Sequence, residues 1–261
     1  MKLIFFAGVG IALSAALVAP ASAQWQTSAG VGARSVTHTE YDLAGRRVVR
    51  ERGWLPGVAL GAAWQSGDLT WTAGIDGYRG DIDYRGQTQG GVRADSATST
   101  TLASMQVGAA YALGRDVSAL AALELDRWKR TIRPAGGSAG LRESYRSWRL
   151  VAGAAKDWRP APGLVRADAA LVLSEPERMR VDFSGMFDTA SFDTRHGRGL
   201  RLGVSLNPAF ARQLVFSARY DWMRIPRSAD TPLTARGELW GMVAQPEHRR
   251  QSLTLTASAV F

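Results

Sequence analysis

Apolar and polar residues alternate with a period of two over much of the chain, which is the pattern of β-strands that have one apolar face. In residues 69–76, for example, Leu, Trp, Ala and Ile alternate with Thr, Thr, Gly and Asp. Seven further segments repeat the alternation: 103–111, 117–126, 147–154, 165–173, 200–206, 214–222 and 252–261. Two weaker segments, 29–38 and 54–64, bring the number of predicted strands to ten.

The connectors between the predicted strands are alternately short and long. Short connectors with turn-forming residues lie at 66–68, 114–116, 156–163 and 207–213. Long polar connectors lie at 42–53, 85–97, 129–143, 175–198 and 224–250. Short turns at one end and long loops at the other are typical of outer-membrane barrels. We therefore predict an all-β fold, a single antiparallel transmembrane β-barrel of ten strands.

A soluble β-sandwich also shows alternation, but its facing sheets bury large apolar side chains between them. Here the polar face of the predicted strands mixes small residues with charged ones: Arg34, Asp76, Glu124, Asp126, Arg149, Arg166, Asp168, Arg201, Arg219 and Asp221. Such a face fits a narrow barrel lumen in which opposite charges pair, while the apolar face contacts lipid.

Aromatic residues gather near both ends of the predicted strands, as in the interfacial belts of membrane proteins. The outer belt is predicted to contain Trp54, Tyr78, Tyr145, Trp148 and Trp222. Trp128 departs from this pattern, because its parity in the strand points into the lumen.

The first 23 residues have the composition of a secretory signal peptide. Lys2 supplies the positive charge, residues 3–18 form an apolar run, and Ala21-Ser22-Ala23 is a small-residue cleavage motif. We predict that residues 1–23 are removed and that residues 24–261 form the barrel. An exported barrel is expected in the outer membrane of a Gram-negative cell. Its last strand ends on Phe261 and resembles the signal that the barrel-assembly machinery recognises.

The charge balance narrows the class of partner. The chain of 261 residues carries 32 Lys and Arg against 23 Asp and Glu, a formal net charge of +9. A basic protein favours an acidic partner, and export makes anionic outer-membrane lipid or lipopolysaccharide a better match than nucleic acid. Guanidinium groups bind phosphate in a bidentate manner, and the predicted loops contain many of them: Arg46, Arg47, Arg50, Arg52, Arg130, Arg133, Arg178, Arg180, Arg195 and Arg198.

Candidate chemistry is sparse. The chain has no cysteine, which excludes disulfides, thiolate metal sites and a cysteine nucleophile. The three histidines, His38, His196 and His248, have no metal-ligand spacing, so we expect neither a metal nor a cofactor. Asp81 and Asp83 are more notable, because at a spacing of two on an extended chain both carboxylates share one face. Two carboxylates that close can hold or activate a water molecule, although Asp is also common at the entrance to a loop.

The chain resembles the omptins, a family of outer-membrane proteases with ten-stranded barrels, five outer loops and a C-terminal Phe. Asp81 and Asp83 match the D-x-D pair of the second omptin outer loop, and residues 40–48 followed by Trp54 look like the first omptin hairpin. The resemblance implies a water held between this pair and an Asp-His pair at the start of the fourth outer loop. Residues 173–178 contain no histidine there.

The nearest Asp-His pair, Asp193 and His196, lies at the far end of the fourth loop with a spacing of three instead of two. The leading prediction is therefore a non-enzymatic outer-membrane protein, structural or binding, that acts through arginine-rich outer loops above a small charged lumen. One alternative is an omptin-like endopeptidase that uses Asp81 and Asp83 together with Asp193 and His196. A second alternative is a small-solute channel, which a lumen filled by side chains disfavours.

Overall fold

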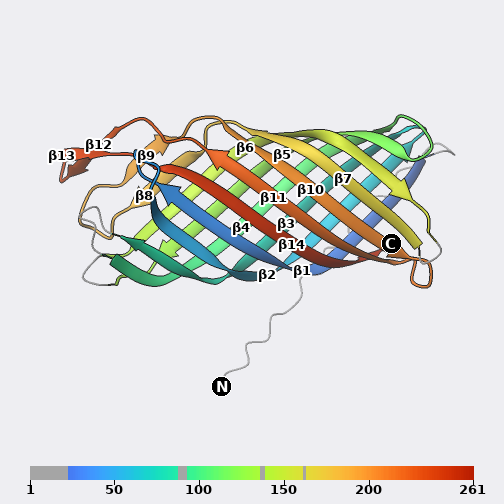
Figure 1. Cartoon of the computed structure of the whole chain (residues 1–261), viewed down its shortest axis with the longest axis horizontal. Helices are drawn as coiled ribbons and strands as arrows, with labels where there is room; N and C mark the ends of the chain where they lie inside the picture. Colours follow the sequence, from blue (N-terminus) through green and yellow to red (C-terminus); the bar gives the residue numbers. More distant parts are fainter. Residues whose placement is uncertain (1–22, 88–92, 136–138, 161–162) are drawn as a thin grey trace, which may run out of the picture.

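The computed structural model describes residues 23–87, 93–135, 139–160 and 163–261, which form strands and connectors (Figure 1). The predicted signal peptide lies outside the described residues, except for Ala23. Within the described ranges, no helix is long and apolar enough to cross a membrane.

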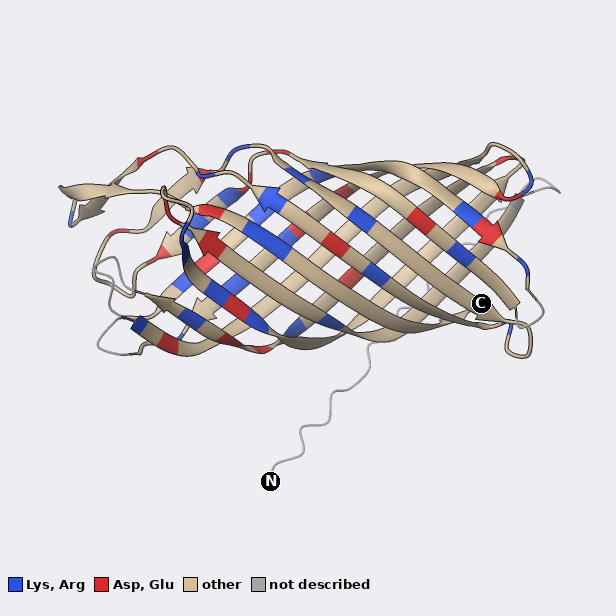
Figure 2. Ribbon diagram, in the orientation of Figure 1, with Lys and Arg blue, Asp and Glu red and all other residues tan. Residues whose placement is uncertain are grey.

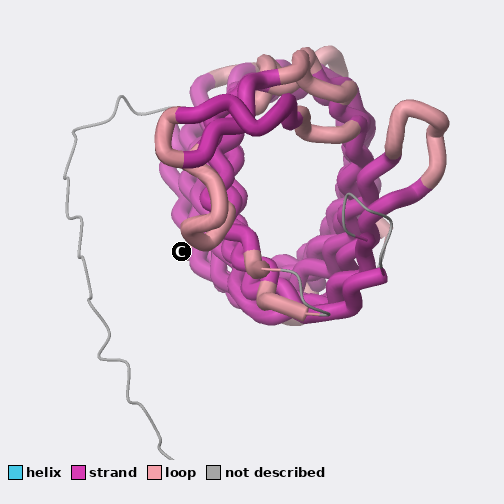
Figure 3. Tube along the Cα trace, turned by 90° about the vertical axis from the view of Figure 1, so that its left-hand side faces the viewer, coloured by secondary structure: helices cyan, strands magenta, loops and turns pink. Residues whose placement is uncertain are grey.

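Ten strands form one closed antiparallel barrel, which confirms the predicted fold. Each strand pairs with the next one around the ring, and β14 pairs with β1 to close it. The barrel strands are β1 (Ala23–Tyr41), β2 (Arg47–Ser66), β3 (Leu69–Gln87), β4 (Arg93–Ala112), β5 (Val117–Ile132), β6 (Leu141–Trp158), β7 (Gly163–Ser174), β10 (Gly197–Pro208), β11 (Leu214–Ile225) and β14 (Glu247–Val260). Seen from the loop end, they make a continuous ring (Figure 3).

Four further strands belong to the outer loops. In the fourth loop, β8 (Arg178–Asp182) pairs with the outer end of β6, and β9 (Ala190–Asp193) pairs with β8. In the fifth loop, β12 (Thr231–Ala235) and β13 (Glu238–Val243) form a separate hairpin. These elements gather at one end of the barrel, and the C-terminus lies at the other (Figure 1).

The short turns use the expected turn chemistry. Gly67, between β2 and β3, has a φ of 59°, which favours glycine over residues with a Cβ. In the outer turn between β1 and β2, Asp42 Oδ1 accepts hydrogen bonds from the amides of Ala44 and Arg46 at 2.9 and 2.8 Å. Gly45 in the same turn has a φ of 73°.

The outward face of the barrel is apolar toward the short-turn end, and the inward face is polar. Leu60, Ile75 and Leu150, for example, point outward and are more than half exposed. Charged residues are most frequent toward the loop end (Figure 2). This division confirms that the alternation separates an apolar exterior from a charged interior.

The barrel strands extend well past the aromatic residues Trp54 and Trp148, which point outward. Beyond them the outward positions are polar: Arg50 and Arg52 on β2, for example, and Arg146 on β6. The predicted loop boundaries were wrong here, because the strands continue after the apolar alternation stops. Backbone pairing between neighbouring strands continues in this outer part of the barrel, as in the pairing of Arg52 with Asp83 across β2 and β3.

Two residues predicted in the outer aromatic belt lie inside the barrel. Tyr78 and Tyr145 are almost fully buried, and the guanidinium carbon of Arg34 lies 4.4 Å from the centroid of the Tyr78 ring. Tyr78 shares its parity with Asp76, which also points inward, so the alternation of β3 itself indicated the inward face. Trp128 is 1% exposed inside the barrel, which confirms its predicted position.

Candidate functional site

A chain of ion pairs crosses the interior of the barrel at mid-height. It begins with Arg34 on β1, which lies 3.4 Å from Asp76 on β3. Arg219 on β11 lies 3.6 Å from the same carboxylate and 3.2 Å from Asp221. Asp221 in turn accepts a hydrogen bond of 2.6 Å from Arg201 on β10. The side chains therefore bridge strands from opposite sides of the ring.

The chain continues through β5 and β6. Arg201 lies 2.9 Å from Glu124, and Arg149 lies 3.3 Å from Glu124 and 2.6 Å from Asp126. Arg250 on β14 then lies 3.6 Å from Asp126. Opposite charges alternate along the whole chain, which is how a polar lumen can be filled without leaving a buried charge unpaired.

Below this chain, toward the short turns, the lumen is open. A cavity of about 680 Å³ is lined by residues that include Gln106, Asp168 and Arg201. Arg201 also belongs to the ion-pair chain, so the cavity ends at that chain.

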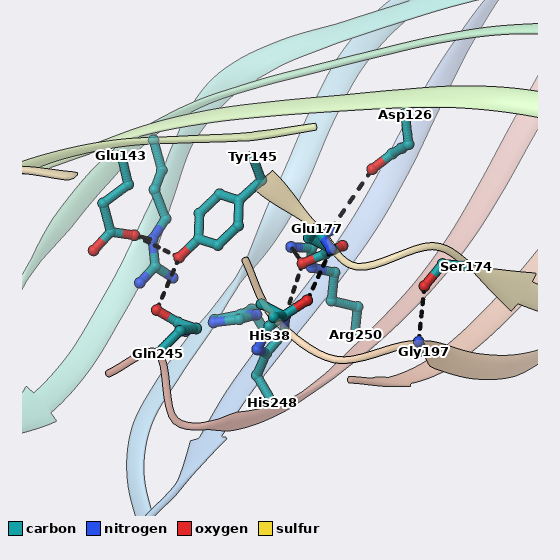
Figure 4. Close-up of polar contacts among 12 residues, drawn as sticks. His38, Asp126, Glu143, Tyr145, Ser174, Glu177, Gly197, Gln245, His248 and Arg250 are labelled. Carbon is teal, nitrogen blue, oxygen red and sulfur yellow. Dashed lines mark hydrogen bonds and ion pairs between the residues drawn. The ribbon is translucent and has the colours of Figure 1, made fainter. Parts of the chain in front are cut away.

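Above the chain, a single guanidinium group is surrounded by carboxylates. Arg130 on β5 donates to Glu40 and Glu51, each at 2.9 Å, and also to Glu143. Tyr145 donates its hydroxyl to Glu143 at 2.8 Å (Figure 4). Arg130 was predicted as a loop residue able to bind phosphate, and this prediction is wrong. Its side chain is 3% exposed, because β5 extends beyond its apolar segment with even-numbered positions facing inward.

The fourth outer loop contributes a buried carboxylate to the same region. Glu177 follows β7 and enters the barrel, where Arg250 lies 2.8 Å and His248 3.1 Å from Glu177 Oε2 (Figure 4). Burial alone would raise the pKa of Glu177, but Arg250 and the hydrogen bond from His248 outweigh it and lower the pKa to about 2.

Trp128 packs these polar groups together. Its ring stacks on Tyr145 with centroids 5.0 Å apart and contacts His38 edge-on at 4.8 Å. The guanidinium carbons of Arg250 and Arg130 lie 4.3 and 5.1 Å from the Trp128 ring centroid. The cluster is thus a packed plug, because its carboxylates are engaged by arginine or histidine and its aromatic rings fill the space between.

The predicted carboxylate pair lies on the outside of the barrel. Asp81 and Asp83 occupy neighbouring outward positions of β3, and Ile82 between them points inward. Asp81 accepts hydrogen bonds of 2.5 Å from both Ser99 and Arg133. Both oxygens of this carboxylate are therefore engaged by neighbouring side chains on the outside of the barrel.

The other predicted pair lies on a different part of the sheet. Asp193 ends β9 and is exposed, and His196 Nδ1 lies 3.3 Å from the Ser174 carbonyl oxygen. In the sheet order, β4, β5, β6 and β8 separate β3 from β9. The described residues therefore do not bring Asp81 and Asp83 together with Asp193 and His196.

A group of unpaired cations lies on the outer surface of β5, β6 and β8. We call it the basic surface, and it consists of Arg127, Lys129, Arg146, Arg178 and Arg180, all exposed or partly exposed outward-facing residues. Among the described residues, no carboxylate lies within ion-pair distance of these five. They line a surface cavity of about 580 Å³ together with Asp193.

The register places three of these arginines side by side. Arg127 is opposite Arg146, Arg146 is opposite Arg178, and Arg178 is opposite Asp193. Like charges on directly opposite residues destabilise a sheet. The row therefore concentrates positive charge on the outer surface, with the carboxylate of Asp193 at its end.

The basic surface could be foreseen only in part. Arg178 and Arg180 were among the predicted phosphate-binding arginines, but they were placed in a loop. Arg127 and Arg146 were not selected, since neither falls in an apolar alternation. The alternation of cations in Arg127-Trp128-Lys129 and in Arg178-Met179-Arg180 was the available signal, because it has the period of a strand.

Comparisons with known proteins support the fold. No family model and no curated protein matches the sequence. Among solved structures, the chain is similar to the outer membrane protease OmpT from Escherichia coli, with 11% identity, 91% of this chain and 96% of that one covered, and a TM-score of 0.62. The translocator domain of the autotransporter NalP from Neisseria meningitidis matches with 14% identity, coverage of 90% and 88%, and a TM-score of 0.47. At this level of identity the likeness to OmpT shows a shared barrel fold.

Proposed function

We propose that the protein is a non-enzymatic component of the outer membrane that binds the phosphate groups of lipopolysaccharide at its basic surface. The row of Arg127, Arg146 and Arg178 carries the proposal, because three neighbouring guanidinium groups without a carboxylate partner form a site for a polyanion.

The position of the row supports a lipid ligand. Leu125 pairs with Trp148, an outward aromatic residue at the edge of the apolar band, and Arg127 lies two residues farther along β5. Two residues of a strand span about 7 Å. Phosphates of a lipid whose acyl chains contact the apolar band would therefore lie at the level of the arginines.

Arginine also binds phosphate with better geometry than lysine does. Its planar fork donates two parallel hydrogen bonds to one phosphate, and a charge-assisted hydrogen bond contributes more than a neutral one. Lys129 and Arg180 lie in the next row, across from Ser144, and would extend the site to a second phosphate.

The distance in the sheet between Asp81 with Asp83 and Asp193 with His196 favours a binding function over peptide hydrolysis.

The test compares two double variants of the refolded barrel with the same change in charge. Arg146→Gln with Arg178→Gln removes the centre of the basic surface. Arg47→Gln with Arg52→Gln removes two exposed arginines of β2 and serves as the control. Binding of lipopolysaccharide and of its dephosphorylated form is measured by titration at several salt concentrations.

We expect the first variant to bind lipopolysaccharide at least 10-fold more weakly, since two charge-assisted contacts of about 1.5–3 kcal/mol each are lost. The control should bind like the wild type, and dephosphorylated lipopolysaccharide should bind weakly to all three proteins. Equal affinity of the first variant and the wild type would refute the proposal.

A further inference from the structure

A second cavity lies at the outer mouth of the barrel, away from the basic surface. Its volume is about 370 Å³, which is within the range of small-molecule sites. The wall comes from the outer ends of β3 to β6, including Tyr84, Ile132 and Leu141. The fourth and fifth loops contribute Phe183, Met186, Phe187 and Leu233. Most of the described lining residues are therefore apolar.

The apolar lining continues onto the loop surface. Phe183 and Phe187 contact each other edge-on with centroids 5.6 Å apart, and Phe187 contacts Trp240 of β13 at 6.2 Å. Trp240 is 69% exposed, and Met186 beside the cavity is 54% exposed. Large exposed apolar side chains that adjoin a cavity indicate a site for an apolar ligand.

Hydrogen bonds hold the loops over the cavity in place. Asp188, close to Phe187 in the fourth loop, accepts hydrogen bonds from the Thr234 hydroxyl at 2.8 Å and from the Gly237 amide at 2.9 Å. Ser184 donates to the carbonyl oxygen of Gly140 at 2.6 Å. These bonds tie the fourth loop to both the fifth loop and the barrel wall, so the cavity is formed before a ligand enters.

The cavity has one charged group and one closed end. Among the described residues that line it, Arg133 is the charged residue, and it uses one nitrogen for Asp81. Its other N–H groups remain available to an anion. At the inner end, Ile132 is buried two residues beyond Arg130, whose cluster with Glu51 fills the lumen. A ligand would thus bind in the cavity without passing through the barrel.

We propose that this cavity binds an amphipathic molecule with a single apolar chain and one anionic head, such as a medium-chain carboxylate. The chain lies among Ile132, Leu141 and Phe183, and the head contacts Arg133 at the rim. This site is separate from the basic surface, because its lining contains none of the five basic-surface residues.

The experiment uses the barrel transferred to an amphipathic polymer, so that free detergent does not compete. The probe is 11-(dansylamino)undecanoic acid, whose fluorescence rises in an apolar environment, and decanoate and decanol are the competitors. Ala94→Phe fills the cavity from β4, and Ala97→Phe on the same strand is the matched control outside the cavity lining. Met186→Ser removes an exposed apolar side chain, so it leaves the fold intact even if Ala94→Phe does not.

We expect saturable probe binding that decanoate displaces, a loss of at least 10-fold in affinity for Ala94→Phe, a smaller loss for Met186→Ser, and no change for Ala97→Phe. Arg133→Gln should weaken decanoate and leave decanol unchanged. The variant with Arg146→Gln and Arg178→Gln should bind the probe normally, which separates this site from the proposed lipopolysaccharide site. No saturable binding, or equal binding by Met186→Ser, Ala94→Phe and Ala97→Phe, would overturn the proposal.

Discussion

Replacing Arg130 by methionine tests whether the plug depends on this one cation. Methionine keeps much of the length of the side chain but removes the donors to Glu40, Glu51 and Glu143. Three buried carboxylates then lack their shared partner. Removing one member of a buried ion pair typically costs about 3–5 kcal/mol, because the remaining charge is left uncompensated. The three contacts share one guanidinium group, so their losses do not add.

We therefore expect Arg130→Met to lower the free energy of unfolding by about 3–5 kcal/mol. Arg127→Met is the matched control, since it lies on the same strand, faces outward and has no carboxylate within ion-pair distance. A surface substitution of this kind changes stability by about 0.5 kcal/mol or less. Urea unfolding of both variants in lipid vesicles, followed by tryptophan fluorescence and by heat-modifiable mobility on a gel, measures the difference.

The deficit of Arg130→Met should also shrink in acid, because protonation of the carboxylates removes their repulsion. A deficit below about 1 kcal/mol at neutral pH, or one equal to that of Arg127→Met, would refute the reasoning, since both outcomes lie outside the range for a broken buried ion pair.

Three further predictions concern pH, permeation and hydrolysis. Because the pKa of Glu177 is lowered from its ordinary value of 4.5 to about 2, its ionised carboxylate stabilises the fold above about pH 4.5, and this contribution is lost as the pH falls toward 2. Between pH 4.5 and 2 the free energy of unfolding of wild type should therefore fall more than that of Glu177→Gln. Parallel plots of the free energy of unfolding against pH for the two proteins would contradict this. The ion-pair chain and the plug above it should together prevent discrete conductance steps in a planar bilayer, even in Arg201→Ser with Arg219→Ser, which opens the chain but leaves the plug; steps from wild type would show an open lumen. Peptides with dibasic sites should stay uncut by the refolded barrel with lipopolysaccharide; cleavage lost in Asp83→Asn would favour the omptin-like alternative.

The sequence was sufficient to predict the barrel, because apolar and polar residues alternate regularly in the half of each strand that carries the apolar outward face. All ten predicted segments fall on barrel strands, with Phe261 of the last segment just beyond the end of β14, and the charged inner face was predicted from the same pattern. The outer half was harder, because its outward face is polar and the alternation of apolar residues stops. For that reason β8 and β9 were assigned to a loop, and Arg130 was taken for a phosphate ligand.

The candidate sites were less accessible to prediction, since they depend on distant parts of the chain. The plug joins Glu40 to Arg130, and the ion-pair chain joins Arg34 to Asp76, contacts that no local spacing reveals. Asp81 and Asp83 show that the spacing of a motif alone does not predict a catalytic site. Their shared face followed from a spacing of two, and the alternation of β3, continued past Asp76, places that face outward together with Trp71 and Ile75.

The closure of the ring by β14 has a consequence for the order of assembly. The amide and carbonyl of Phe261 bond to Thr27, and Val260 pairs with Ser28, so the last residues of the chain meet the first strand. Until the C-terminal strand is in place, β1 and β11 each present an unpaired edge, which is a template for mispairing with another chain. The closing contacts span more than 200 residues of sequence, and such distant pairing is slow. The chain is thus most prone to mispair and aggregate before β14 has closed the ring, and a copy that lacks β14 would remain in that state.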